Sequence, residues 1–237
     1  MNSVLVIILI LAIANCANLP SYFSQCSKTD ANLNDCLLAN TKTAWPTMVN
    51  GDSVYHIQPM NPLRVPFIHV DIDGNLQGNL SNTVIDGMQD VDFQEIKLDL
   101  AKNRLDLTFL IPRLTFIGDY EVDGRLLLVP IKGSGPANIT FINMLTNYFL
   151  EYDIKEKRTK QYIHVKNSAM KYTVTRVYSY FSGYETLGID FNKVLDENWE
   201  AVNEEVGANV GNAIGEIFTQ ILQSFFKKVS LNELFSD

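Results

Sequence analysis

The most regular pattern of apolar and polar positions lies near the end of the chain, in residues 199–229. No proline interrupts this stretch, and its apolar residues recur at the three- and four-residue spacing of a helix. At about 1.5 Å per residue the predicted helix is about 45 Å long, which is about the diameter of a compact domain of this size. We therefore expect it to run from one end of the molecule to the other.

Apolar positions occupy an unusually wide part of this helix. When the residues are placed at steps of about 100°, the polar positions Glu205, Asn209, Asn212, Glu216, Gln223 and Lys227 share one narrow arc. A helix at a protein surface needs an apolar stripe only a little wider than about 100°. The pattern therefore predicts a helix around which a curved sheet is wrapped. More than half of the circumference is apolar, through Trp199, Val202, Val206, Val210, Ile214, Ile217, Phe218, Ile221, Leu222 and Phe225.

Three glycines, Gly207, Gly211 and Gly215, share one side of the predicted helix. Each destabilises a helix interior by about 1 kcal/mol relative to alanine, so something must offset that cost. Close approach of a neighbouring strand is the interpretation we favour, and a groove kept open for an elongated ligand is the alternative. Dimerisation inside a membrane is excluded because Glu204 and Glu216 interrupt the segment.

Upstream of this helix the pattern changes to the two-residue period of strands. Residues 96–100 and 105–109 alternate on either side of a turn at 101–104, which predicts a hairpin. Asp123-Gly124 between two apolar runs predicts a second hairpin with a type I′ turn. Further strands are expected within 139–149, 162–165 and 172–181.

Other segments mark where these elements end. A short helix is expected over residues 32–44, and Trp45-Pro46 indicates an irregular passage after it. Gly133-Ser134-Gly135-Pro136 is expected to break the sheet, and the charged residues 155–160 are expected to form the solvated tip of a hairpin. The order is a short helix, a long antiparallel meander and then the long helix.

These elements predict an α+β protein. An antiparallel sheet often buries one face only, and the C-terminal helix is the only large apolar partner for that face. We therefore expect a long C-terminal helix wrapped by a highly curved antiparallel sheet. No Gly-, Ser- or Pro-rich linker separates two domains, so residues 17–237 are expected to form a single domain.

The first residues have the pattern of a secretory signal peptide. Residues 4–14 are apolar, which is too short for a bilayer crossing of about 20 residues. Small residues follow, so cleavage is expected after Ala14, Cys16 or Ala17. We assign residues 1–16 to the signal peptide, with an uncleaved anchor as the alternative. The mature protein is then extracellular and has no integral membrane segment.

Secretion also determines how we interpret the cysteines and the Asn-X-Ser/Thr sequences. Removing the signal leaves Cys26 and Cys36, and two cysteines so close in a secreted chain are expected to form a disulfide. Closing this short loop stabilises the fold by about 3 kcal/mol in the chain-entropy model. Asn79 and Asn138 each begin a glycosylation sequence and could carry glycans if exposed.

Charge and motif content argue against several classes of function. The formal net charge of -8 argues against nucleic-acid binding, which requires clustered Lys and Arg. The chain has no G-x-S-x-G, H-E-x-x-H, C-x-x-C or P-loop motif. His56, His69 and His164 lack the spacing of metal ligands on a helix. The segment 71–75 is expected to be a turn rather than a calcium loop. We therefore expect no catalysis, no cofactor and no metal.

Several segments together resemble one known family, and their order and spacing extend along nearly the whole mature chain. They are Cys26 and Cys36; Gln58-Pro59-Met60-Asn61-Pro62-Leu63-Arg64-Val65-Pro66; Pro112-Arg113-Leu114; Gly118-Asp119-Tyr120; Gly124-Arg125-Leu126; Pro130-Ile131; Gly133-Ser134-Gly135; Phe181-Ser182-Gly183; Leu187-Gly188; Leu195-Asp196-Glu197-Asn198-Trp199; and Leu234-Phe235. In this set the chain resembles the insect Takeout and haemolymph juvenile-hormone-binding proteins.

The resemblance implies a tubular lipid-binding fold of the super-roll type, with an internal hydrophobic tunnel. It also implies secretion and binding of small lipophilic ligands, in haemolymph or in tissues linked to feeding, chemosensation and circadian output. Two features depart from the family pattern. The family's NLFNG turn is here Tyr180-Phe181-Ser182-Gly183, and the second disulfide of the hormone carriers cannot form with two mature cysteines. The departures favour the Takeout branch.

We therefore expect a secreted carrier of a terpenoid, juvenile-hormone-like or fatty lipid. Burial contributes about 0.8 kcal/mol per methylene, so a long lipid gains much from a dry tunnel. The alternatives are a secreted interaction or signalling protein whose cavity has collapsed or is only structural, and a lipid-ester hydrolase. The residues expected to line the tunnel are Trp45, Phe67, Leu98, Leu107, Phe109, Phe116, Leu128, Trp199, Val202, Val206, Val210, Ile214, Ile217 and Ile221.

Overall fold

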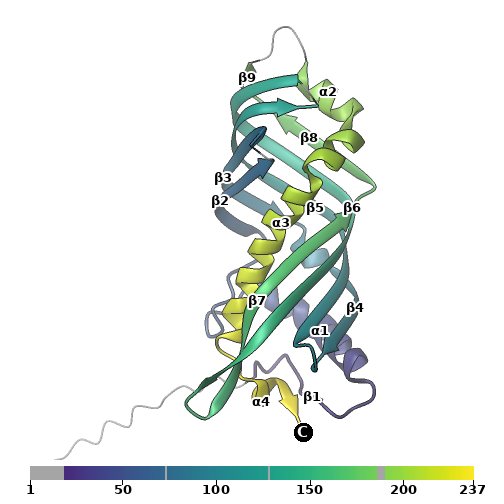
Figure 1. The fold of residues 1–237 in the computed structure, drawn as a ribbon, viewed down its shortest axis with the longest axis vertical. Coiled ribbons are helices and arrows are strands. Elements are labelled where there is room, and N and C mark those ends of the chain that lie inside the picture. Colours follow the sequence, from purple (N-terminus) through teal and green to yellow (C-terminus); the bar gives the residue numbers. More distant parts are fainter. Residues whose placement is uncertain (1–18, 73, 128, 186–189) are drawn as a thin grey trace, which may run out of the picture.

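The computed structural model of the protein describes residues 19–72, 74–127, 129–185 and 190–237. A curled antiparallel sheet and one long helix run along the long axis of an elongated molecule (Figure 1). The signal peptide expected at residues 1–16 lies outside the described residues. The elements are β1 (Cys26–Ser27), α1 (Leu33–Met48), β2 (Leu63–Ile72), β3 (Leu76–Asp86), the 3₁₀ turn η1 (Met88–Asp90), β4 (Asp92–Asp99), β5 (Arg104–Leu126), β6 (Val129–Lys157), β7 (Lys160–Thr173), β8 (Arg176–Phe181), β9 (Tyr184–Glu185), α2 (Phe191–Glu197), α3 (Trp199–Phe226), α4 (Leu231–Leu234) and β10 (Phe235–Ser236).

Two very long strands, β5 and β6, organise the sheet. They pair with each other antiparallel from Arg104↔Glu151 to Leu126↔Val129. On its other edge, each of these strands pairs with different strands along its length. From its start to its end, β5 pairs with β4 and then with β3, and β6 pairs with β9, then β8, then β7. The sheet therefore has two tiers. We call β2, β3, β8, β9, α2, residues 199–210 and the parts of β5 and β6 that pair with β3, β8 and β9 the upper half (Figure 1). We call α1, β4, β7, α4 and the rest of α3 the lower half, although the end of β7 at Tyr172 reaches the upper half.

The helix α3 closes the open side of the curled sheet. It contacts β2 at one margin of the sheet and β7 and β8 at the other. Its 28 residues confirm the predicted length, although the helix ends at Phe226 and the short α4 follows. The predicted fold class, an α+β protein with a long C-terminal helix and a highly curved antiparallel sheet, is confirmed.

The glycines of α3 face β7. A Cβ atom at Gly211 would lie 2.9 Å from the Met170 carbonyl oxygen, and one at Gly215 would lie 2.9 Å from the Met170 Cβ. Because real Cβ contacts are longer than this, only glycine allows β7 to approach so closely at these two positions. The favoured interpretation, close approach of a strand, is confirmed at Gly211 and Gly215, whereas at Gly207 the nearest atom to an added Cβ is the Tyr172 hydroxyl oxygen, at 3.4 Å.

The first helix extends beyond the end expected from the sequence. Residues 32–44 were predicted, but α1 continues through Pro46 to Met48. Pro46 lies in the last turn, and the residues beside it are anchored by packing. Trp45 is buried and donates a hydrogen bond from Nε1 to the Met88 carbonyl oxygen at 2.8 Å. Tertiary packing here outweighs the local signal that favours an irregular passage.

Two predicted breaks in the sheet are wrong, and both rest on glycines. Strand β5 continues through Gly124, where a Cβ would lie 2.2 Å from the Asn75 carbonyl oxygen. Strand β6 continues through Gly135, where a Cβ would lie 2.6 Å from the Ser182 carbonyl oxygen. These glycines permit close approach of neighbouring backbone, which composition alone does not distinguish from a turn.

The remaining turn predictions agree with the strand register. The hairpin around 101–104 is confirmed by the pairing of β4 with β5. The charged segment 155–160 forms the β6–β7 hairpin tip, closed by the Lys157↔Lys160 pair. Segment 71–75 lies at the β2–β3 hairpin, where Asp71 Oδ1 accepts a hydrogen bond from the Gly74 amide at 2.9 Å.

The predicted disulfide is confirmed and lies at the lower end of the molecule. It joins Cys26 in β1 to Cys36 in α1, with the two Cα atoms 6.0 Å apart. Strand β1 pairs in parallel with β10, so the bridge ties α1 to the C-terminal segment. Among the described residues, no helix combines the length and the apolarity that a membrane crossing needs.

Candidate functional site

The upper half contains a partly open cavity of ≈ 220 Å³ between the curled sheet and the first part of α3. Its wall is almost entirely apolar. The lining residues are Ile68, Val70, Leu76, Gly78, Asn79, Leu80, Phe116, Tyr120, Glu121, Val122, Leu126, Ile131, Ile139, Phe141, Tyr172, Val177, Ser179, Phe181, Phe191, Leu195, Trp199, Val202, Asn203, Val206, Val210, Ala213 and Ile214.

The local pattern of each element explains why the wall is apolar. Side chains of a strand alternate between its two faces, and in β2 this alternation directs Ile68 and Val70 to the cavity. On α3, Val202, Val206 and Val210 follow at four-residue spacing and lie above one another on one face. Their side chains are short, which leaves space between the helix and the sheet.

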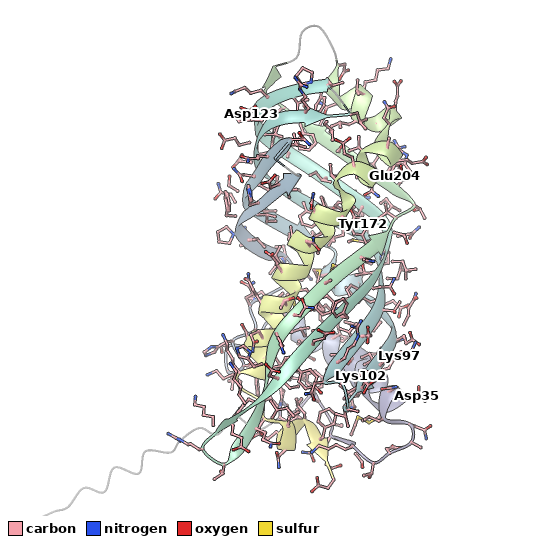
Figure 2. All side chains as sticks on the ribbon, viewed as in Figure 1. Asp35, Lys97, Lys102, Asp123, Tyr172 and Glu204 are labelled. Atoms are coloured by element: carbon pink, nitrogen blue, oxygen red, sulfur yellow. A yellow bond between two sulfur atoms is a disulfide. The ribbon has the colours of Figure 1, made fainter. Side chains whose placement is uncertain are left out.

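A hydroxyl and an amide provide the main polar pair in the wall. Tyr172 Oη donates a hydrogen bond to Asn203 Oδ1 at 3.0 Å, and Tyr172 lies beside α3, about midway along it (Figure 2). Burial raises the pKa of the Tyr172 hydroxyl, so it stays a neutral donor at physiological pH. No described residue accepts a hydrogen bond from Asn203 Nδ2, which leaves both N–H groups of this amide available near the cavity.

Among the described residues that line the cavity there is no Lys, Arg or His. Its one acidic residue, Glu121, is exposed and lies between Tyr120 and Val122 in β5. Because both neighbours also line the cavity, Glu121 presents its carboxylate to the outer face of the strand. The interior is therefore uncharged. Among the described residues, no cluster of His, Cys, Asp and Glu could hold a metal ion.

The upper end of the cavity is covered by α2, which buries Phe191 and Leu195. Asn192 fixes this helix to β8: its Oδ1 accepts from the Phe181 amide at 2.9 Å and its Nδ2 donates to the Phe181 carbonyl oxygen at 2.8 Å. Arg176 on β8 forms an ion pair with Asp196 at the other end of α2. Polar contacts outside the cavity thus hold its apolar cover in place.

A second cavity of ≈ 30 Å³ lies in the lower half. Phe116 and Ile214 line both cavities and therefore stand between them. Beyond them, Phe218 packs with its ring centroid 5.6 Å from that of Phe109 and 4.9 Å from that of Tyr148. The interior is roomy in the upper half and nearly filled by aromatic rings in the lower half.

Most residues expected at the tunnel wall lie at one of the two cavities. The larger one is lined by Phe116, Trp199, Val202, Val206, Val210 and Ile214. The smaller one is lined by Phe109, Ile217 and Ile221, together with Phe116 and Ile214. Whether any of them contacts a ligand stays a prediction.

The structure places four of the expected residues away from both cavities, and Leu128 lies outside the described residues. Phe67 is 58% exposed, because its neighbour Ile68 takes the inward position in β2. Trp45 packs on Phe93 under α1. Leu107 is buried in the core of the lower half, and Leu98 packs against that core.

Most of the wall contributed by β2, β3, β6, β8 and α2 was not predicted from the sequence. Alternation could have identified Ile68 and Val70 on β2 and Ile139 and Phe141 on β6, because each pair lies two residues apart. The cover helix α2 has only seven residues, and its clearest sequence signal is the N-cap Asp190, whose Oδ1 accepts a hydrogen bond from the Lys193 amide at 3.2 Å. Tyr172 and Asn203 meet only through the packing of β7 against α3.

Comparisons with known proteins agree on one relationship. A sequence model of the family described as "Haemolymph juvenile hormone binding protein (JHBP)" matches residues 4–236. The chain is 23% identical to "Circadian clock-controlled protein daywake" of Drosophila melanogaster, and the match covers 91% of this chain and 88% of that protein. The daywake protein of Drosophila yakuba is 22% identical over the same shares.

Among solved structures, the chain is similar to Takeout 1 of Epiphyas postvittana. The TM-score is 0.75 at 22% sequence identity, and the match covers 90% of this chain and 99% of that one. This likeness shows a shared fold along nearly the full length.

Proposed function

The chain belongs to the haemolymph juvenile hormone binding protein family, and from this membership we propose that it is a secreted, non-catalytic carrier of a small, neutral, lipophilic ligand held in the upper cavity. The observation that carries the proposal is the cavity of ≈ 220 Å³ with an uncharged, apolar wall. An apolar cavity of about 150 Å³ is large enough to bind benzene, so the mostly apolar upper cavity has room for a small lipophilic molecule.

The polarity of the wall supports a neutral ligand. Moving a carboxylate into a site without a cation is strongly unfavourable, so a fatty acid anion lacks a partner there. An ester, ketone or ether oxygen can instead accept the hydrogen bond that Asn203 Nδ2 offers. We therefore place the polar group of the ligand beside Asn203 and Tyr172, and its hydrocarbon part along Val202, Val206 and Val210.

Secretion is part of the same proposal. The Cys26–Cys36 bridge supports it, because stable disulfides form in oxidising compartments. The apolar run at residues 4–14 supports it as well.

The fluorescent probe 1-anilinonaphthalene-8-sulfonate is an anion, so its displacement would not show whether the cavity prefers a neutral ligand. The test therefore uses the neutral probe N-phenyl-1-naphthylamine. We expect this probe to bind the purified protein. A medium-chain methyl ester should displace it with an inhibition constant at least about tenfold lower than that of the matching acid at pH 7. The Val206→Phe variant, which fills the cavity, should lose at least about 90% of probe binding. The matched control is Val54→Phe, because Val54 is 61% exposed and lies outside the cavity.

Two results would overturn the carrier proposal. One is probe binding that Val206→Phe leaves unchanged. The other is a protein, purified from its native source, that carries no lipophilic molecule detectable by solvent extraction and mass spectrometry and also binds no probe. In that case the cavity is only structural, and a secreted interaction or signalling protein becomes the better interpretation.

A further inference from the structure

The outer face of the sheet in the upper half carries a small group of exposed apolar side chains. Ile117 on β5 is 50% exposed, and Tyr178 and Tyr180 on β8 are 53% and 58% exposed. Strand β6 runs between them. In its register, Asn138 pairs with Ile117 on one side and with Tyr180 on the other.

Asn138 points away from the cavity, toward these side chains. Its neighbour Ile139 lines the cavity, as does Phe141, so alternation places Asn138 and Thr140 on the outer face. Asn138 is exposed. Direct cross-strand neighbours have Cβ atoms about 5 Å apart, so Ile117 and Tyr180 flank the Asn138 amide closely.

Asn138-Ile139-Thr140 is also an acceptor sequence for N-linked glycosylation. The second such sequence, at Asn79, lies on the same outer face but in different surroundings. Asn79 is half-buried, and its Oδ1 lies 2.7 Å from His69 Nδ1. Its register neighbours are His69 and Glu121, both polar. The chain thus contains two acceptor motifs, Asn-Leu-Ser and Asn-Ile-Thr. Of the two, only Asn138 has exposed apolar side chains, Ile117 and Tyr180, as its direct register neighbours.

We propose that Asn138 carries an N-linked glycan whose first sugars pack on Tyr180 and Ile117. The bond that forms joins Asn138 Nδ2 to C1 of the first sugar. The bond that breaks joins this C1 to the pyrophosphate oxygen of a lipid-linked donor of the secretory pathway. The lipid pyrophosphate is the leaving group, and the amide loses a proton. The C–H face of a pyranose ring packs on an aromatic ring while its hydroxyls remain in water. This inference rests on the proposed secretion and is independent of ligand binding.

The first experiment maps the modification. The full chain is expressed with its own signal in insect cells, and the secreted protein is analysed by intact and peptide mass spectrometry before and after peptide-N-glycosidase treatment. We expect a glycan mass on the peptide that contains Asn138. Asn138→Gln should remove it, and Asn79→Gln should leave it in place. Secreted protein with an unmodified Asn138 overturns the inference, and failure of secretion overturns its premise as well.

The second experiment asks whether the sugars pack on the side chains beside Asn138. Enzymatic removal of the glycan should lower the Tm of the wild type by about 2 °C, which corresponds to less than about 1 kcal/mol for a chain of this length. In Tyr180→Ser the same treatment should shift the Tm by less than half as much. Ile154→Ser is the control, because Ile154 is 43% exposed and lies near the tip of the β6–β7 hairpin, far along β6 from Asn138.

Equal shifts in the wild type and in Tyr180→Ser would show that the glycan does not contact the ring, and would overturn the packing. A secreted, unglycosylated protein that elutes as a dimer, and that Tyr180→Ser converts to a monomer, would assign the patch to a second copy instead. Probe binding in the upper cavity is measured separately on the same samples, so failure here is distinguishable from failure of the carrier proposal.

Discussion

The two parts of α3 face the same sheet with very different packing. From Trp199 to Val210 the helix has no buried side chain, although its valines face the interior. From Gly211 onward, Gly211, Gly215, Phe218, Ile221, Phe225 and Phe226 are buried. One helix therefore borders a ≈ 220 Å³ cavity in the upper half and a nearly filled core in the lower half. The apolar character of the helix is the same in both, and the sizes of the facing side chains determine whether a cavity remains.

This comparison indicates which half of the molecule determines the stability of the fold and which half determines ligand binding. The lower half holds the disulfide, the aromatic cluster around Phe218 and the C-terminal segment formed by α4 and β10. The upper half holds the cavity and an apolar cover fixed by polar contacts from outside. We therefore expect changes in the lower half to act mainly on stability, and changes in the upper half to act mainly on ligand binding.

The largest expected effect comes from truncating an aromatic ring in the lower half. Phe218 is 6% exposed and touches Phe109 and Tyr148, so Phe218→Ala should lower the free energy of unfolding by about 3–5 kcal/mol. The matched change in the upper half is Phe181→Ala. Phe181 already borders empty space and is half-buried, so its loss should be less than about 2 kcal/mol. Urea unfolding measures both, and equal losses would contradict the difference between the halves.

The next effect concerns the covalent link in the lower half. Removing the Cys26–Cys36 bridge with the double variant Cys26→Ser/Cys36→Ser should lower the free energy of unfolding by about 3 kcal/mol, since the unfolded chain regains the entropy of an open loop. Well below the Tm, the Kd of the cavity probe should remain within about twofold of the wild type. A large loss of probe affinity would show that the two halves are coupled.

The contrast between the halves also explains what sequence analysis could and could not predict. Helical periodicity over residues 199–229 is a local property, so the long helix and its wide apolar arc were predictable. Val206 and Phe218 lie in the same arc, however, and no local signal shows that one faces a cavity and the other a filled core. That difference depends on which side chains of the sheet face each residue, and strands such as β2 pack against α3 from distant positions in the sequence.

The interpretation of the glycines shows the same limit of prediction from local sequence. Gly211 was correctly interpreted as a site of close strand approach because its cost inside a helix requires an explanation. Gly124 was wrongly interpreted as a turn, because a glycine between apolar runs has the same local appearance whether the strand reverses or a neighbouring backbone comes close. Its contact partner, the Asn75 carbonyl oxygen, belongs to the β2–β3 connection.

The glycines Gly207 and Gly211 of α3 allow a prediction in which the expected change in the free energy of unfolding is of intermediate size. At Gly211 an added Cβ would lie 2.9 Å from the Met170 carbonyl oxygen, whereas at Gly207 the nearest atom is the Tyr172 hydroxyl oxygen at 3.4 Å. Gly211→Ala should therefore destabilise the protein by about 1–3 kcal/mol through overpacking. Gly207→Ala should be neutral or stabilising by up to about 1 kcal/mol, because alanine favours the helix. Similar effects at both positions would show that β7 packs equally tightly along α3.

The smallest expected effect is a dependence on pH confined to the lower half. Burial raises the pKa of Glu233, but hydrogen bonds from Lys160 and Ser230 outweigh burial, so the net shift is downward. The Lys160 ammonium lies 2.7 Å from Glu233 Oε1, and the Ser230 amide donates to Oε2 at 2.7 Å. A carboxyl group whose pKa is lower in the folded state stabilises the fold above its unfolded pKa, here near 4.5, and loses that contribution as the pH falls through the folded pKa.

Unfolding by urea at pH 7 and at pH 3 tests this linkage. Between these two pH values the wild type should lose about 1 kcal/mol more of its free energy of unfolding than Glu233→Gln, an amount typical of a helix cap. Lys160→Met should reduce this acid-induced loss without abolishing it, because Ser230 still donates a hydrogen bond to Glu233. Since the described part of the cavity wall contains no buried carboxylate, probe affinity should stay constant until the protein unfolds. If probe affinity falls with acid before the unfolding transition, and Glu233→Gln prevents that fall, the lower half controls the cavity and the separation of the two halves is wrong.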